Sequence, residues 1–365
     1  ETPKEKWAGI TNPIRSEVDF DKSNIEYIEF WMLDPFINYT DRGKVIDGVY
    51  NDFNTTGGKL IFHLGSVSED VIRDGKHGFE NGLPPNGVID GSSTTTTSFG
   101  YVTSTQYVTN AFDNDVNARV NQDVGMDGVI NSNEAAFFST YIDALAGLSP
   151  DALNKVLEDP SSDNFRFYFS DFYDNNNAKI LERYKNYNGH DNNSPVPGAN
   201  DLISNAGSAL PENEDLNADN TLSETEEYYE YDIDITPSKM GIGNEYIVDR
   251  IETDDNQILK EKVNWYLYRI PIRDFERQFG NIEGFKSIKY IRMILTGFEQ
   301  PVVLRLANFR MVGSRWRRHT SSLREGGFIP TPEENYDDFA VSVVNLEENG
   351  ASDESKPAYV IPPGV

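Results

Sequence analysis

Short apolar runs near both ends of the chain predict β-strands. They are Ile25–Leu33, Lys59–Leu64, Glu230–Ile235, Trp265–Ile272, Ile288–Leu295 and Val302–Val312. Runs of this length, rich in aromatic and β-branched residues and bounded by Gly, Pro or Asp, are typical of antiparallel sheets. We therefore predict a mainly β fold, an antiparallel, jelly-roll-like β-sandwich made from residues 20–69 and 228–315.

Residues 70–227 have a different pattern, rich in Asn, Asp, Ser, Thr and Gly with short apolar runs. We interpret this stretch as a long insertion in the sandwich. Helical spacing predicts one short helix over residues 134–146, and Ser149-Pro150 predicts the start of a second. The apolar residues Leu153, Val156 and Leu157 would be its buried stripe. The tract Thr94–Thr97 is expected to be a loop.

The two ends of the chain are expected to lie outside the sandwich. We interpret residues 1–19 as a lead-in from a preceding domain. Residues 316–365 are interpreted as a linker and the start of a next domain, with one alternating strand at Phe339–Val343. The basic patch Arg315–Arg318 either binds an acidic partner or is a solvated strand end.

The net charge of the chain limits the kinds of molecule that it can bind. The 365 residues include 60 acidic and 32 basic side chains, a net charge of -28, and no cysteine. Such a chain repels nucleic acid and anionic membranes and attracts divalent cations. No apolar stretch approaches the roughly 20 residues of a membrane-spanning helix, so no direct span is expected.

One Asx-rich segment matches the spacing of a twelve-residue calcium loop. Carboxylate or amide oxygens fall at positions 1, 3 and 5, a backbone carbonyl at 7, a serine at 9 and a glutamate at 12. These residues are Asp215, Asn217, Asp219, Thr221, Ser223 and Glu226. Asn220 stands where glycine is usual, and Asn tolerates the left-handed conformation. The segment predicts a structural Ca²⁺ site, or else Asx turns without metal.

A second segment matches the same spacing less completely. Its expected ligands are the side chains of Asp123, Asp127, Asn131 and Glu134 and the carbonyl of Val129. Gly128 takes position 6, but Gly125 leaves position 3 without a ligand. A neighbour such as Asp113, Asp115 or Asn117 is the expected replacement, and a helix should follow Glu134.

No arrangement of residues predicts catalysis. The four histidines are scattered, without the spacing of a zinc site, and there is no nucleophile elbow or phosphate-binding glycine loop. We expect that the chain is not an enzyme. Its tryptophans fit either a core or the sugar-stacking platforms of a carbohydrate-binding module, and Trp31 and Trp265 lie within apolar strands.

Several long strings resemble one family. They are residues 24–36, 65–75, 79–84, 122–128, 307–316 and 344–349. In these strings the chain resembles the SprA/Sov proteins, the giant outer-membrane translocon of the type IX secretion system. The resemblance covers nearly all of this chain but a small part of that protein.

The resemblance implies a non-catalytic structural domain of an export channel, associated with the outer membrane on its periplasmic or cell-surface side. Implied partners are the barrel and neighbouring domains of the same polypeptide, other type IX components and exported cargo. The alternative is a carbohydrate-binding β-sandwich of a secreted or cell-surface protein. Exposed, coplanar aromatic rings on one sheet would favour that alternative.

Overall fold

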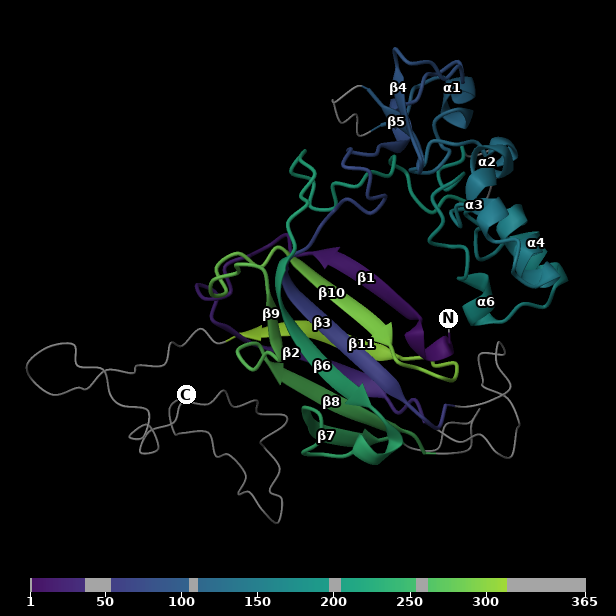
Figure 1. The fold of residues 1–365 in the computed structure, drawn as a ribbon. Helices are drawn as coiled ribbons and strands as arrows, with labels where there is room; N and C mark the ends of the chain where they lie inside the picture. The colour runs from purple at the N-terminus through teal and green to yellow at the C-terminus, as the bar shows by residue number, and fades with distance from the viewer. Residues whose placement is uncertain (1, 37–53, 105–110, 197–204, 254–261, 314–365) are drawn as a thin grey trace, which may run out of the picture.

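A computed structural model describes residues 2–36, 54–104, 111–196, 205–253 and 262–313 (Figure 1). Both the Arg315–Arg318 patch and the strand expected at Phe339–Val343 lie outside these ranges. Most strands belong to a sandwich of a five-stranded sheet, ordered β1-β10-β3-β6-β9, and a four-stranded sheet, ordered β11-β2-β8-β7. All strand pairs within them are antiparallel. The mainly β sandwich predicted from the sequence is therefore confirmed.

Six of the nine sandwich strands in the described ranges follow the predicted apolar runs closely, and three edge strands have no predicted counterpart. The five-stranded sheet contains β1 (Trp7–Pro13), β10 (Tyr290–Thr296), β3 (Gly58–Ser66), β6 (Glu227–Ile235) and β9 (Arg277–Phe279). The four-stranded sheet contains β11 (Leu306–Gly313), β2 (Ile25–Leu33), β8 (Asn264–Pro271) and β7 (Ile247–Glu252). Short 3-10 turns are η1 (Pro3–Glu5), η2 (Glu80–Gly82) and η3 (Pro237–Lys239).

The core lies between the inner faces of the two sheets. Alternate residues of each central strand point inward, so that Phe30 on β2 meets Phe62 on β3, with ring centroids 5.6 Å apart. Phe30 also stacks on Tyr268 of β8 at 5.1 Å. All three side chains are completely buried. This alternation is the period-2 pattern that identified the strands in the sequence.

One strand comes from residues 1–19, which we expected to be a lead-in. β1 pairs with β10 from Trp7↔Thr296 to Pro13↔Tyr290 and forms an edge of the five-stranded sheet. Its side chains are mostly exposed, and Trp7 is 71% exposed. The sandwich therefore begins at Trp7. An edge strand with little buried surface lacks the apolar alternation by which sequence analysis finds strands.

The insertion projects from one end of the sandwich (Figure 1). It contains a hairpin and six short helices among the described residues. These are β4 (Thr94–Thr97), β5 (Gly100–Thr103), α1 (Val116–Val120), α2 (Asn131–Phe137), α3 (Ser139–Ala144), α4 (Pro150–Glu158), α5 (Asp171–Asn175) and α6 (Ile180–Arg183). The threonine tract that we expected to be a loop is the strand β4, paired with β5. Threonine is β-branched and favours strands, which the low-complexity interpretation overlooked.

The predicted helices differ from the observed ones in two details. The helix expected over residues 134–146 is divided at Phe138, which lies between α2 and α3. Its φ of -89° and ψ of 19° are outside the helical range. The second helix starts as predicted, with the Ser149 hydroxyl accepting from the Ala152 amide at 3.3 Å. Its apolar stripe is only partly buried, since Leu153 and Val156 are half-buried and Leu157 is 44% exposed. Among the described residues, no strand makes extensive contact with α4.

Candidate metal centre

The Asp215–Glu226 loop forms a tight Asx-stabilised turn. The carboxylate of Asp215 accepts hydrogen bonds from the backbone amides of Asp219 and Asn220. Asp219 Oδ1 accepts from the Thr221 amide at 2.9 Å and from the Thr221 hydroxyl. Asn220 has a φ of 66°, the left-handed conformation anticipated for position 6. The expected turn forms, and its first two carboxylates bind donors within the loop.

The remaining expected ligands of this loop contact the sandwich. Glu226 accepts from Arg292 Nη1 at 3.1 Å and from Nη2 at 3.0 Å. Asn217 donates to the Tyr290 hydroxyl at 2.7 Å, although its Oδ1 is buried without a partner. The Ser223 amide donates to Glu69 at 3.0 Å. The structure therefore directs the side chains of positions 3 and 12 toward β10 (Tyr290–Thr296).

These contacts belong to a neck, which we define as residues 67–78 and 212–226, where the chain enters and leaves the insertion. Glu69 is 3% exposed and accepts from the Tyr290 hydroxyl at 2.5 Å and the Asn217 amide at 3.2 Å. Glu214 accepts from the amides of Ile72 and Gly78, each at 2.9 Å. Two buried glutamates thus hold the segments of the neck together.

The second loop is an Asx-stabilised turn with two glycines in the left-handed conformation. Gly125 and Gly128 have φ of 73° and 66°, and Val129 donates its amide to Asp127 Oδ1 at 2.9 Å. Asp123, at position 1, accepts the Ser194 amide at 3.2 Å on both carboxylate oxygens. Burial raises the pKa of Asp123, and it raises the pKa of the neighbouring Glu80 to about 9. Asp123 therefore serves to connect the loop to another segment of the insertion.

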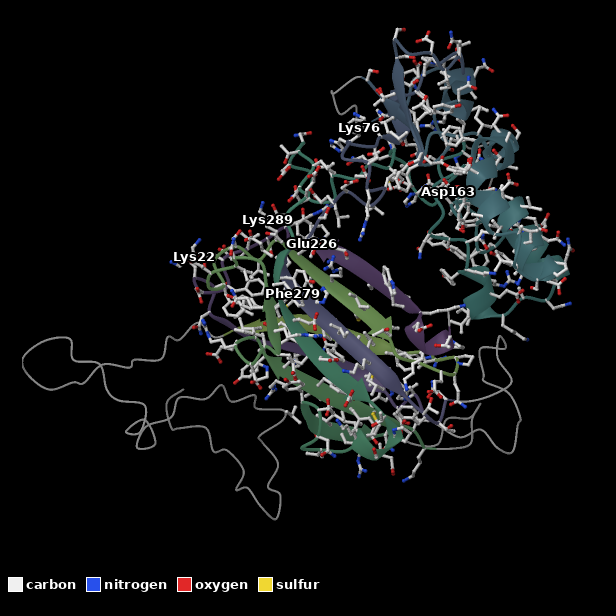
Figure 2. The ribbon with its side chains drawn as sticks, viewed as in Figure 1. Lys22, Lys76, Asp163, Glu226, Phe279 and Lys289 are labelled. Atoms are coloured by element: carbon white, nitrogen blue, oxygen red, sulfur yellow. The ribbon has the colours of Figure 1, made fainter. Side chains whose placement is uncertain are left out.

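Five carboxylates gather behind this loop, in what we call the acidic cluster. Its members are Asp127, Glu134, Asp159, Asp163 and Asp191. Carboxylate oxygens of Glu134, Asp159 and Asp163 all lie within 4.8 Å of one another. Asn131, expected at position 9, donates its side-chain amide to Asp191. Figure 2 shows Asp163 within the insertion and Glu226 at the end of the sandwich, so the two predicted loops lie in different parts of the molecule.

The space beside Gly125, at position 3, is filled by a side chain that spacing did not identify. A Cβ on Gly125 would collide with Oδ2 of Asp163, so this carboxylate occupies the space of the missing side chain. Asp163 is held by the Ser161 hydroxyl, which donates to Oδ1 at 2.8 Å. The neighbours that we expected there have other roles. Asp115 caps α1 by accepting from the Asn117 amide at 2.9 Å.

Burial and mutual repulsion raise the pKa values of the carboxyl groups in the cluster. Burial, followed by the charge of Asp163, raises the pKa of Asp127 to about 8 and that of Glu134 to about 7. The same causes raise the pKa of Asp191 to about 8. A buried carboxylate beside other carboxylates requires either a proton or a cation.

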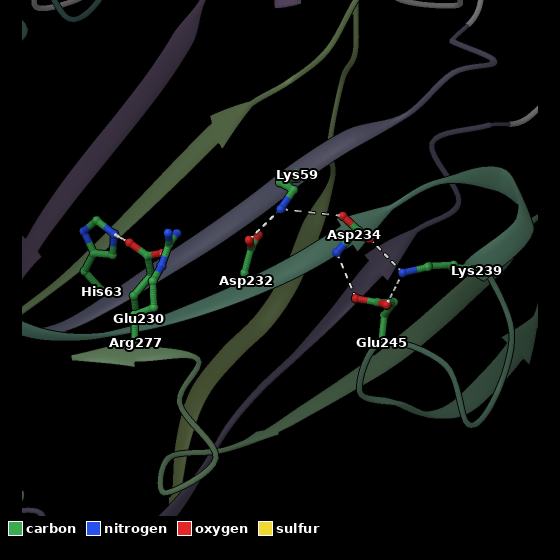
Figure 3. A network of polar contacts seen from close by, with 8 residues as sticks. All are labelled: Lys59, His63, Glu230, Asp232, Asp234, Lys239, Glu245 and Arg277. Carbon is green, nitrogen blue, oxygen red and sulfur yellow. Dashed lines mark hydrogen bonds and ion pairs between the residues drawn. The ribbon is translucent and has the colours of Figure 1, made fainter. Parts of the chain in front are cut away.

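A second polar arrangement lies on the outer face of the five-stranded sheet (Figure 3). His63 on β3 is 4% exposed, and its Nε2 contacts Glu230 Oε2 on β6 at 3.0 Å. Arg292 Nε donates to His63 Nδ1 at 3.0 Å, so the hydrogen is on Nε2. Arg277 pairs with the other side of Glu230. These side chains cross the sheet from β10 to β9 and are satisfied by one another.

The aromatic residues on this face are stacked rather than open. Tyr228 lies 4.1 Å from His63 and 4.9 Å from Phe279, measured between ring centroids, and Arg292 lies over its ring. Trp31 and Trp265, on the four-stranded sheet, are half-buried.

Within the described residues, none of the helices has the length and apolar character needed to cross a bilayer.

In comparison with known proteins, the family SprA_N, described as motility related/secretion protein, matches residues 140–365. The matched range starts within α3 and includes the rest of the insertion and strands β6 to β11. No curated protein matches the chain.

Proposed function

Because the chain belongs to the SprA_N family of motility-related secretion proteins, we propose that it is a non-catalytic structural domain of an outer-membrane protein-export channel, the type IX secretion translocon. The observation that carries this proposal is the extent of the match, which includes sequence of both the insertion and the sandwich. The resemblance of strings near the beginning of the chain supports it further. The domain would be associated with the outer membrane, on its periplasmic or cell-surface side.

The proposed partners are the barrel and neighbouring domains of the same polypeptide, other type IX components and exported cargo. The edge strand β1 supports a role in docking. Trp7 and Ile10 are 71% and 65% exposed, and within the described residues no strand pairs with the outer edge of β1. An edge with exposed apolar side chains is suited to burial against another protein segment.

The alternative, a carbohydrate-binding sandwich, has less support. A sugar platform needs aromatic rings with open faces. The ring of Tyr228 is already stacked on His63 and Phe279, as described above. Trp7 is open, but it lies on an edge strand. The alternative therefore serves as one outcome of the experiment.

The test removes the insertion from the full-length protein while keeping the neck. Residues 79–213 would be replaced by a short Gly/Ser linker between Gly78 and Glu214, whose backbones already contact at 3.3 Å. We expect normal amounts of the protein in the outer membrane, with strongly reduced cargo secretion and motility. Asp219→Asn, an isosteric change on the exposed part of the neck, is the matched control and should secrete normally.

Two measurements would contradict the proposal. One is normal secretion and motility by the excised protein at normal abundance. The other is normal secretion together with polysaccharide binding that the excision or Trp7→Ala abolishes, which would establish the carbohydrate-binding alternative.

A further inference from the structure

Glu134 is a buried carboxylate with little compensation. The residue is completely buried, and within the described parts of the chain neither carboxylate oxygen has a hydrogen-bond partner of acceptable geometry, although Ser161 is close enough to stabilise the charged form. It belongs to α2, directly after the loop, at the position where calcium loops place their last acidic ligand. Burying a carboxylate without compensation is strongly unfavourable, so this side chain requires either a proton or a cation.

The oxygens around Glu134 have the spacing of a coordination shell. Those of Glu134, Asp159 and Asp163 lie within 4.8 Å of one another. Ligands on opposite sides of one Ca²⁺, at 2.3–2.6 Å each, are separated by about 5 Å. Asp127 Oδ2 is also buried and has no hydrogen-bond partner among the described residues, and Asp127 interacts electrostatically with Asp163 and Glu134.

We propose that one Ca²⁺ binds between the Asp123–Glu134 loop and the turn at residues 159–163, with Asp127, Glu134, Asp159 and Asp163 as carboxylate ligands. Asp163 supplies the position-3 ligand from outside the loop, in the space left by Gly125. Asp191 supports the site through its hydrogen bond with Asn131. This site is independent of the function proposed above, since it would exist in either kind of module.

Calcium fits the donor set better than other cations. All four ligands are hard carboxylate oxygens, without sulfur or imidazole, which disfavours zinc. Mg²⁺ demands a smaller, nearly octahedral arrangement and retains several waters. Four carboxylates exceed the charge of one Ca²⁺, and backbone or water oxygens would complete its six to eight ligands.

The ion would add a cross-link between two segments of the insertion. The main apolar cluster of the molecule consists of residues of the sandwich. Around the acidic cluster the contacts include the buried side chains of Val124 and Val129, the Asn131–Asp191 hydrogen bond and isolated bridges such as Val124↔Asp191 and Asn164↔Asp191. A domain with a small apolar core commonly depends on bound metal or covalent links, and this chain has no cysteine.

The test measures thermal unfolding of this chain in millimolar Ca²⁺, in millimolar Mg²⁺ and in chelator, with amide hydrogen exchange to localise the effect. We expect Ca²⁺ to raise Tm by about 5 °C or more. It should also slow exchange in residues 123–134 and 159–163, and Mg²⁺ should do neither. Isothermal titration calorimetry should give one site in this part of the chain.

Two isosteric variants, Asp163→Asn and Glu134→Gln, distinguish Ca²⁺ ligands from carboxylates that only stabilise the fold. Each removes one charge from the cluster. In chelator each variant should be more stable than the wild type, because carboxylate repulsion decreases. In Ca²⁺ each should lose most of the Ca²⁺-induced shift and bind at least about tenfold more weakly. Asp219→Asn, in the other predicted loop, is the matched control and should keep the full response.

The proposal is overturned if the wild type unfolds at the same Tm and exchanges equally in Ca²⁺ and chelator, which would indicate a cluster neutralised by protons. It is also overturned if Asp219→Asn removes the response while Asp163→Asn and Glu134→Gln keep it. That result would place the ion in the Asp215–Glu226 loop.

Discussion

The carboxylate of Asp163 occupies the space that a side chain on Gly125 would need. This relationship predicts the effect of the smallest possible substitution. Gly125→Ala adds a Cβ that collides with Asp163 Oδ2, and it forces alanine to adopt a φ of 73°. We expect a loss of about 1–3 kcal/mol in the free energy of unfolding, measured with urea.

Gly147→Ala is the matched control for that substitution. A Cβ at Gly147 meets no atom within 4 Å, and this glycine belongs to the same insertion. It should change the free energy of unfolding by less than about 0.5 kcal/mol. Equal effects of the two substitutions would show that Asp163 does not occupy the space beside Gly125.

The Tyr290 hydroxyl connects the sandwich with the neck. It donates to Glu69 and accepts from Asn217, and Tyr290→Phe removes both hydrogen bonds. Because Glu69 is buried and keeps two backbone donors, we expect a loss of about 1–3 kcal/mol, concentrated in the neck. Amide exchange at Asn217 and Ser223 should accelerate. Tyr229→Phe, which loses one bond to the Gly284 carbonyl at 3.3 Å, should leave those amides unchanged.

Glu29 holds the edge strand β11 against the four-stranded sheet. Its carboxylate is 1% exposed and accepts from Arg269 Nε at 2.8 Å and Arg310 Nε at 2.9 Å. Burial acts to raise the pKa of Glu29, but the two arginines outweigh it and leave the pKa below its ordinary value.

Glu29→Gln should therefore lower the free energy of unfolding by about 1–2 kcal/mol at neutral pH, in a urea titration. The contribution of Glu29 is present above its unfolded pKa and is lost on acidification, so the wild type and variant should converge at low pH. For comparison, Lys22→Ala breaks the exposed pair with Glu17 and should cost less than about 0.5 kcal/mol. A difference between Glu29→Gln and wild type that persists at low pH would contradict the assignment.

His63 should make the sandwich sensitive to mild acid. Burial, with the charge of Arg292, lowers the pKa of His63 from 6.5 to about 4. Between these values the unfolded chain binds a proton that the folded chain does not, so stability decreases as pH falls through this window. Integrated over the window, the loss is at most about 3 kcal/mol.

The measurement compares the pH dependence of urea unfolding for the wild type and His63→Gln, which cannot titrate. Their difference should change between pH 6.5 and about 4 and be constant above pH 7. A parallel pair of curves across that window would show that His63 is protonated in the fold, or that its pKa is not lowered.

The sequence predicted the parts of this fold that depend on repeated local patterns. Strand β2 coincides with the predicted run Ile25–Leu33 because every second side chain enters the core. Edge strands β1, β7 and β9 bury little and therefore lack such a pattern. Local spacing also has a limit at α4. Its apolar stripe correctly predicted a helix, but spacing within one helix does not show whether another element covers that stripe.

The candidate site was predictable only where its residues are adjacent in sequence. Asp127 and Glu134 follow from the twelve-residue spacing, and the glycine at 125 marked a missing ligand. Asp159 and Asp163 come from another segment, and no spacing rule connects them with the loop. The Asp215–Glu226 segment shows the opposite case. Its spacing matches the twelve-residue calcium loop more completely than that of the other segment. However, its Glu226 and Asn217 side chains bind Arg292 and Tyr290, and no local sequence pattern reveals such distant partners.

The closeness of the two ends of the insertion has an evolutionary consequence. Phe79 and Asn213 form a β-bridge, so the chain returns to nearly the same point after its excursion. Exchange, shortening or lengthening of the intervening segment leaves the strand order of the sandwich unchanged and alters loop-closure entropy only slowly with length. Two relatives can therefore share the same sandwich while their insertions diverge rapidly in size and sequence.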